Sequence, residues 1–239
     1  MLVRAFLDII FPPLCHGCRA HVPGKGEIPL CAGCWDRIAP IASPLCPVCG
    51  APFITEHGND HPCGPCLTER PPFAGARSAV EFHGMVQELV HRFKYGGKMY
   101  LARTLGLLAA RALSGFARDT APECIIPVPL HTRRLRERGF NQSQLLGRIL
   151  AERWSLPLSV NNLRRARWTE PQVGLSVSDR ERNVRGAFTV AHPERIREKR
   201  VLLVDDVYTT GSTVAECART LARAGAKEVS VVTVARAVP

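Results

Sequence analysis

The sequence has few aromatic side chains and no long apolar run. Aromatic residues make up 6% of its 239 residues, which argues against a surface built to stack the bases of single-stranded nucleic acid. No apolar segment reaches the roughly 20 residues that a membrane-spanning helix needs. Residues 2–14 are largely apolar, but Asp8 interrupts them and no small-residue cleavage site follows before Cys15. We therefore expect a short amphipathic helix that ends at Pro12 and Pro13, not a signal peptide.

Acidic residues are scarce relative to basic ones. The chain has 32 Lys and Arg against 21 Asp and Glu, and a formal net charge of +11. Residues 1–70 hold five of the basic and six of the acidic residues, which leaves a net charge of +12 on residues 71–239. Such an excess favours anionic partners, either a small phosphorylated ligand or nucleic acid, although a solvated basic surface has the same composition.

Cysteine, in contrast, is abundant and regularly spaced. Eight of the ten cysteines form four Cys-x-x-Cys pairs, which are Cys15/Cys18, Cys31/Cys34, Cys46/Cys49 and Cys63/Cys66. Each pair turns two thiolates towards one point, so the spacing predicts two structural Zn²⁺ ions in tandem zinc ribbons. A disulfide framework would need an exported chain, and a thioredoxin-type redox pair would follow a strand and open a helix. Pairing within each ribbon is simplest, and crossed pairing stays open.

The remaining residues near these cysteines have less specific roles. His16, His57 and His61 are expected to be neighbours of the metal sites and not ligands, because eight thiolates already complete two sites. The segment lacks a large apolar core, so the metal should supply much of its folding free energy. The Pro- and Gly-rich stretch 67–75 indicates a boundary between a zinc-ribbon domain, residues 1–70, and a second domain, residues 71–239.

Residues 200–214, RVLLVDDVYTTGSTV, carry the most informative pattern. The apolar run 201–204 is typical of a buried parallel strand, and Asp205 and Asp206 stand at its carboxyl end. A hydroxyl-rich turn and an apolar-faced helix follow. The N–H groups of a helix N-terminus suit a phosphate, and the turn residues Thr209, Thr210, Gly211, Ser212 and Thr213 can close around it. The carboxylates fit vicinal ribose hydroxyls or Mg²⁺. The alternative is an ordinary strand-to-helix turn.

A second buried strand, 124–128, is followed by a cluster of arginines. These are Arg133, Arg134, Arg136 and Arg138, and a helix with Asn141 as a possible N-cap comes next. Ligands of open α/β sheets bind outside the carboxyl ends of the strands. The arginines should therefore share one sheet edge with Asp205 and Asp206, where guanidinium groups match a pyrophosphate. A basic surface loop is the alternative.

The other segments have weaker signals. We expect strands at 76–82, 187–190 and 228–234, the last closing the sheet, and helices at 83–93 and 98–113. The joint Lys94–Lys98 either contacts a phosphate or is a plain helix–helix turn. The polar stretch 164–185 predicts a long binding loop, in which Trp168 either stacks a base or holds the loop against the core. Outside this stretch, Cys124 and Cys217 should be core residues. The loop's candidate ligand side chains are Arg164, Arg165, Arg167, Gln172, Arg180 and Arg182.

The run VDDVYTTGST resembles the signature of type I phosphoribosyltransferases, which bind phosphoribosyl pyrophosphate (PRPP). Four Cys-x-x-Cys units followed by IPVPLHTRRLRERGFNQSQLL, NVRGAF and VLLVDDVYTTGST resemble the ComF family, competence-protein-F-like phosphoribosyltransferases with a double zinc ribbon, over nearly the full chain. The resemblance implies an α/β, Rossmann-like type I phosphoribosyltransferase fold with a parallel sheet. It also implies a cytoplasmic bacterial protein linked to natural transformation.

The resemblance implies roles for the site residues. Asp205 and Asp206 would hold the ribose hydroxyls and Mg²⁺, and Thr209–Thr213 the 5′-phosphate, while Arg133, Arg134 and Arg138 are candidates for the pyrophosphate. Thr209 stands where 6-oxopurine transferases have an aspartate, which disfavours hypoxanthine or guanine as acceptor. Two alternatives stay open: a protein that senses PRPP without turnover, and a single-stranded-DNA-binding accessory protein of natural transformation whose ribbons hold a partner such as a helicase.

Overall fold

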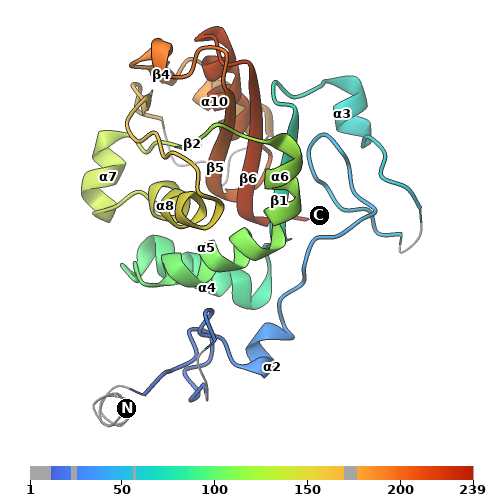
Figure 1. Cartoon of the computed structure of the whole chain (residues 1–239), viewed down its shortest axis with the longest axis vertical. Helices are drawn as coiled ribbons and strands as arrows, with labels where there is room; N and C mark the ends of the chain where they lie inside the picture. The colour runs from blue at the N-terminus through green and yellow to red at the C-terminus, as the bar shows by residue number, and fades with distance from the viewer. Residues whose placement is uncertain (1–11, 23–25, 56–57, 170–176, 239) are drawn as a thin grey trace.

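The computed structural model describes residues 12–22, 26–55, 58–169 and 177–238 (Figure 1). The helix expected within residues 2–14 lies almost entirely outside the described residues, as do His57 and Gln172. The side chain of Arg180 is not described either.

A parallel four-stranded sheet forms the centre of the molecule. Its strands are β1 (Gly75–Glu81), β2 (Cys124–Pro127), β5 (Arg200–Tyr208) and β6 (Glu228–Arg236). The order is β1-β6-β5-β2, and each neighbouring pair is parallel. Most residues of these strands are buried, because both faces of the sheet are covered. The predicted α/β fold is confirmed, but β6 lies inside the sheet and does not close an edge.

Helices cover both faces of this sheet. On one face lie α4 (Gly84–Tyr95), α5 (Leu101–Ala112) and α8 (Gln142–Trp154), and their apolar side chains share a core with Leu202 and Val204 of β5. On the other face lies α10 (Ser212–Arg223), which shares a second core with Val201 and Leu203. Alternate side chains of one strand thus enter different cores, as the pleat requires.

Strand β5 is longer than its apolar run. It pairs with β6 from Arg200 to Tyr208, so Asp205 and Asp206 lie within the strand and not beyond it. The apolar side chains stop at Val204, whereas the backbone hydrogen bonds continue to Tyr208. The sequence pattern indicates the apolar side chains but not the hydrogen bonds. The backbone positions of both acidic residues are consequently fixed by the sheet.

The polar stretch 164–185 is more ordered than predicted. Its ends form β3 (Leu163–Arg165), antiparallel to β4 (Phe188–Val190), and α9 (Val177–Val184). The prediction of one long loop was wrong at these ends, because Leu163, Val184 and Phe188 are buried against α10. The remaining elements are α2 (Ala32–Trp35), α3 (Gly64–Thr68), α6 (Ser114–Thr120), α7 (Thr132–Arg138) and the 3₁₀ helix η1 (Pro193–Arg195).

The two ribbons pack on opposite faces of the sheet. Cys15 and Cys34 of the first ribbon join the core of α4 and α5, whereas Cys46 and Cys66 of the second join the core of α10. Figure 1 shows α2 next to α4 and α3 near β1. Between the ribbons, the chain covers the edge of β1 with three hydrogen bonds: Ile41 N to Ala79 O at 3.1 Å, Glu81 N to Ala39 O at 2.9 Å and Ala76 N to Val48 O at 2.8 Å. An edge covered in this way is closed to pairing with another chain.

None of the helices in the described part of the chain is long and apolar enough to cross a bilayer.

Gly50 is the tightest point of the contact between the second ribbon and the sheet. Its φ is +73°, and a Cβ atom there would lie 2.4 Å from the carbonyl oxygen of Ala76. We expect Gly50→Ala to lower the free energy of unfolding by more than ~1 kcal/mol, because both the backbone conformation and the space reject a side chain. Denaturant unfolding of the zinc-loaded protein measures this. Gly33→Ala is the matched control, since a Cβ there meets nothing within 4 Å; equal stability of the two variants would contradict the prediction.

Candidate functional site

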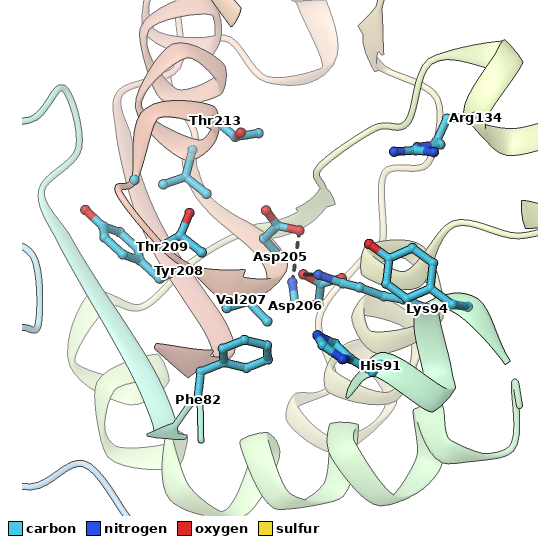
Figure 2. A pocket seen from close by; sticks show the side chains of 13 residues that line it. Phe82, His91, Lys94, Arg134, Asp205, Asp206, Val207, Tyr208, Thr209 and Thr213 are labelled. Carbon is cyan, nitrogen blue, oxygen red and sulfur yellow. Dashed lines mark hydrogen bonds and ion pairs between the residues drawn. The ribbon is translucent and has the colours of Figure 1, made fainter. Parts of the chain in front are cut away.

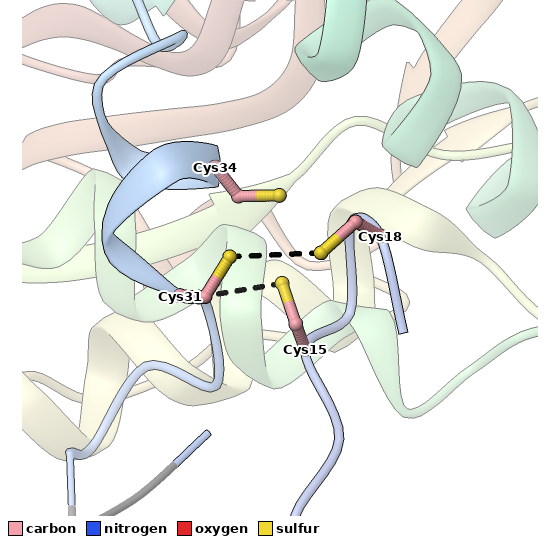
Figure 3. A group of neighbouring side chains, drawn as sticks. All are labelled: Cys15, Cys18, Cys31 and Cys34. Atoms are coloured by element: carbon pink, nitrogen blue, oxygen red, sulfur yellow. Dashed lines mark hydrogen bonds between the residues drawn. The ribbon is translucent and has the colours of Figure 1, made fainter. Parts of the chain in front are cut away.

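Eight cysteines form two compact groups of four thiols. The sulfur atoms of each group lie within 4.8 Å of one another. The first group is Cys15, Cys18, Cys31 and Cys34, which Figure 3 shows, and the second is Cys46, Cys49, Cys63 and Cys66. A tetrahedral Zn²⁺ site with Zn–S bonds of about 2.3 Å places its sulfur atoms about 3.8 Å apart. The Sγ atoms of Cys18 and Cys31 are 3.6 Å apart, as are those of Cys49 and Cys63. The residues therefore fit structural Zn²⁺, with pairing within each ribbon and not across them.

Backbone donors prepare one thiol of each group for metal. Cys31 N donates to Cys15 Sγ at 3.3 Å, and Cys63 N donates to Cys46 Sγ at 3.4 Å. Burial opposes ionisation of Cys15 and Cys46, but hydrogen bonds from backbone N–H groups outweigh it and lower the pKa of each thiol to about 6. Both are then thiolates, the form that binds Zn²⁺, at neutral pH.

The neighbouring histidines have other partners. His16 Nδ1 lies 2.6 Å from Thr104 Oγ1 in α5, and the His61 ring stacks on Phe53 with centroids 4.0 Å apart. Neither belongs to a four-thiol group, as the sequence predicted.

A cleft opens at the carboxyl end of β5 (Figure 2). It consists of two adjoining cavities of about 300 and about 200 Å³. Both are lined by Lys94, Arg134, Asp205, Asp206 and Thr213. The larger also has an aromatic wall of Phe82, His91, Tyr95 and Tyr208, and the smaller is lined in addition by Arg138, Gln142, Arg165 and Trp168. The cleft thus places an acidic pair among cations at the sheet edge that the sequence predicted.

Asp206 is paired with a residue of α4. It forms an ion pair with Lys94 at the end of α4, with Nζ 2.7 Å from Oδ1. Burial alone would lower the pKa of Lys94, but the charge of Asp206, and secondly that of Asp205, raises it. Lys94 therefore stays protonated and balances one charge of the pair.

Asp205 lies next to a second set of donors. Ser143 Oγ at the start of α8 donates to Asp205 Oδ1 at 2.8 Å, and the backbone N–H of Asp206 donates to the same oxygen at 2.9 Å. Burial and the neighbouring Asp206 charge nevertheless raise the pKa of Asp205 to about 6. Two charged carboxylates at these positions are therefore unfavourable, and a bound ligand or cation can reduce their repulsion.

The hydroxyl-rich loop joins β5 to α10. Gly211 occupies the N-cap of α10 with φ +81°, and it has no side chain to satisfy the first N–H groups of the helix, which favours binding of an anion. Thr209, Gly211 and Thr213 line the cleft. Thr210 and Ser212 lie beside it, with their hydroxyl oxygens 2.8 Å apart.

The predicted arginines of α7 divide into two groups. Arg134 lines both cavities, and Arg138 lines the smaller one and lies 5.2 Å from the centroid of the Tyr95 ring. Arg133 lines neither: its guanidinium lies 4.7 Å from the centroid of Trp168, which does line the cleft. The structure therefore brings two of the three arginines to the site and places the third behind Trp168.

Among the candidates of the polar stretch, only Arg165 lines the cleft in the described part of the chain. Arg164 Nε donates to Asn161 O at 3.1 Å, and Arg167 donates to Asn183 O at 2.9 Å, so these two hold the local backbone. Arg182 pairs with Asp179 at 2.6 Å. Trp168 packs between Arg133 and His131.

Sequence reasoning missed the roles of Ser143 and Gln142 and left Lys94 undecided. Gln142 is 1% exposed, and its amide nitrogen has no hydrogen-bond partner among the described residues although the side chain lines the cleft. Such a buried donor is costly unless a ligand pairs with it. A signal was present, because both residues directly follow Asn141, which caps α8 by accepting from Ser143 N at 3.0 Å.

The fold and the cleft define a phosphoribosyltransferase-type domain that follows a double zinc ribbon. Residues 144–238 match the family model of the phosphoribosyl transferase domain, and residues 6–67 match that of the double zinc ribbon domain.

Relatives along the whole chain narrow the class. The chain is 35% identical over 231 residues to competence protein F of Haemophilus influenzae, which covers 93% of this chain and 96% of the relative. It is 35% identical over 223 residues to DNA utilization protein YhgH of Escherichia coli strain K12, covering 92% and 95%. Competence protein ComFC of Bacillus subtilis is 27% identical over 212 residues, covering 84% and 81%. The chain belongs to the ComF family.

The raised pKa of Asp205 predicts a pH-dependent gain in stability for Asp205→Asn. The folded-state pKa of about 6 exceeds the ordinary aspartate pKa of 3.8, so the protonated form stabilises the fold at low pH and this contribution is lost as the pH rises through 6. We expect the variant to be more stable than the wild type at pH 8, by up to ~3 kcal/mol, and to lose this advantage below pH 4. Urea unfolding across this pH range measures it, with the exposed Asp119→Asn as control. A gain in stability at pH 4 with none at pH 8 would contradict a raised pKa for Asp205.

Proposed function

We propose that the cleft binds PRPP together with Mg²⁺ and that the chain is a phosphoribosyltransferase that transfers the pentosyl group. One observation carries the proposal: Figure 2 shows the acidic pair between the loop residues Thr209 and Thr213 on one side and Arg134 on the other. Arg138 lines the adjoining cavity. PRPP has the complementary order of groups, a diol between a 5′-phosphate and a pyrophosphate. A carboxylate pair would be of no use to a surface that binds only phosphates.

Each part of PRPP has a set of side chains that suits it. Asp205 and Asp206 accept hydrogen bonds from the ribose hydroxyls, and the loop Thr209, Thr210, Gly211, Ser212 and Thr213 holds the 5′-phosphate. Arg134 and Arg138, with the unpartnered Gln142 amide, hold the pyrophosphate, and Arg133 acts through Trp168. Hydrogen bonds between guanidinium groups and phosphate oxygens are strong and directional.

Mg²⁺ fits the same donor set. Carboxylate and phosphate oxygens are the ligands it prefers, and Asp205 and Asp206 supply the protein oxygens. Bound Mg²⁺ supplies additional positive charge for the pyrophosphate. The chain's own contribution is to hold the ribose still and to surround the departing pyrophosphate with fixed cations, which lowers the barrier by positioning and by charge neutralisation.

The acceptor binds beside the aromatic wall. Phe82, His91 and Tyr95 line the larger cavity next to Asp206, and the His91 ring centroid lies 6.0 Å from those of Phe82 and Tyr95. Aromatic faces favour a planar acceptor.

We further propose a cytoplasmic role in handling DNA, with single-stranded DNA and a helicase as partners. The relatives are named competence and DNA utilization proteins, and residues 71–239 carry the basic excess of the chain. Arg133 and Arg136 are exposed on α7, where a nucleic acid backbone can reach them. Recognition of PRPP without turnover is the alternative that keeps the same cleft.

The double variant Asp205→Asn/Asp206→Asn tests the PRPP site. We expect it to lose PRPP binding, because amides neither match the diol as well nor bind Mg²⁺, while zinc content and circular dichroism stay unchanged. Isothermal titration calorimetry with PRPP and MgCl₂ measures the affinity. Asp119→Asn, exposed on α6, is the matched control and should bind as the wild type does. Equal affinity of wild type and double variant would mean that PRPP binds elsewhere or not at all.

Replacing Arg133 and Arg134 by alanine tests the DNA proposal. Each phosphate contact contributes about 0.7 to the slope of log affinity against log salt concentration on a single strand. We expect the variant to bind a fluorescent oligodeoxythymidylate more weakly and to reduce this slope by about 1.4, as measured by anisotropy at several salt concentrations. Arg118→Ala, exposed on α6, controls for net charge. An unchanged affinity and slope would exclude Arg133 and Arg134 from DNA binding.

A further inference from the structure

Arg236, the last residue of β6, is a buried arginine whose guanidinium donates to the second zinc ribbon. It is 9% exposed. Its guanidinium donates to Cys49 O at 2.8 Å and to Cys49 Sγ at 3.7 Å. Among the described residues, Arg236 forms no ion pair with a carboxylate.

The zinc–thiolate group of this ribbon would supply the negative charge that balances Arg236. Zn²⁺ bound by the four thiolates Cys46, Cys49, Cys63 and Cys66 has a net charge of −2, and hydrogen bonds to the ligand sulfur atoms compensate such charge. A buried cation without a partner is strongly unfavourable. Arg236 and the metal site therefore depend on each other electrostatically.

The other face of Arg236 contacts the end of β5. Its guanidinium lies 4.2 Å from the centroid of the Tyr208 ring, a favourable cation–π distance. The two residues are opposite each other in the β5–β6 pair, and Ala237 N donates to Tyr208 O at 2.9 Å. Tyr208 is 5% exposed, and burial raises its pKa to about 12, so the ring stays neutral.

Tyr208 in turn packs against the hydroxyl-rich loop that joins β5 to α10. A Cβ atom on Gly211 would lie 2.2 Å from the Tyr208 hydroxyl oxygen, so the ring occupies the space beside the Gly211 backbone. Figure 2 shows Tyr208 next to Thr209 at the start of this loop. A continuous series of contacts, Cys49 to Arg236 to Tyr208 to Gly211, thus connects the second metal site with the loop.

We propose that Arg236 is a positioning residue that couples zinc in the second ribbon to the phosphate-binding form of the loop. Zinc fixes Arg236, Arg236 fixes the Tyr208 ring, and the ring supports Gly211 at φ +81°. The proposal rests on the proposed function in one respect, which is that this loop binds the 5′-phosphate of PRPP. It assigns the second ribbon a role in ligand binding beyond folding.

The first ribbon provides a matched contrast. Arg37 donates to Cys34 Sγ at 3.3 Å, so it also contacts a metal-site thiol. Unlike Arg236, it is exposed, and its ribbon packs against α4 and α5, on the face of the sheet opposite α10. Loss of Arg37 should therefore leave the loop intact.

The experiment compares Arg236→Met and Arg236→Lys with Arg37→Met in the zinc-loaded full chain. Calorimetry gives PRPP affinity in MgCl₂, and a chromogenic chelator gives the zinc retained at equilibrium. We expect Arg236→Met to weaken PRPP binding about 5- to 10-fold and to retain less zinc, and Arg236→Lys to recover part of both. Arg37→Met should bind PRPP as the wild type does.

Linkage provides a second readout, which begins with the wild type alone. If zinc strengthens PRPP binding by some factor, PRPP strengthens zinc binding by the same factor. Saturating PRPP should therefore increase the zinc that the wild type retains against the chelator, and Arg236→Met should abolish this increase. A wild type that binds no PRPP would overturn the proposed function and this inference with it. PRPP binding that neither depends on Arg236 nor changes zinc retention would overturn the coupling alone.

Discussion

Repulsion between two carboxylates at adjacent positions of one central strand is the constraint on which the site depends. Strand pairing with β6 continues from Asp205 to Tyr208, so the backbone of both acidic residues is held within the sheet. Each then meets a donor from a different helix, Lys94 from the end of α4 and Ser143 from the start of α8. The compensation is incomplete, because the pKa of Asp205 stays raised to about 6. The site is thus most stable with a partner for the pair, and the packing of α4 and α8 against β5 fixes its geometry.

The zinc ribbons meet a second constraint, the exposed edge of β1. Residues 39–48 hydrogen bond to this edge, while the two ribbons join the cores on the two faces of the sheet. We expect zinc to supply much of the folding free energy of the ribbons, and their contacts with the β1 edge and both cores add to it. Arg236 extends this dependence from the second ribbon to the loop that joins β5 to α10.

Local patterns in the sequence predicted the parts of the molecule that depend on local physics. Cys-x-x-Cys spacing predicted the thiol groups, the apolar run 201–204 predicted a buried strand, and Asn141 predicted the start of α8. The extension of β5 to Tyr208 was missed because its hydrogen bonds depend on β6, which lies 20 or more residues further along the chain. Lys94 and Arg236 have partners that only tertiary packing provides. The local sequence therefore left the role of the turn at Lys94 undecided and indicated no more than a strand end at Arg236.

The most direct measurement of the central claim is a crystal structure of the zinc-loaded protein with ribose 5-phosphate. This ligand carries the phosphate and the diol but no pyrophosphate, so it isolates the contacts assigned to the β5–α10 segment. The account predicts the phosphate within hydrogen-bond distance of the Thr209–Thr213 loop and the 2′- and 3′-hydroxyls on Asp205 and Asp206. Electron density for the sugar at another place, or its absence from the cleft at saturating concentration, would contradict the account.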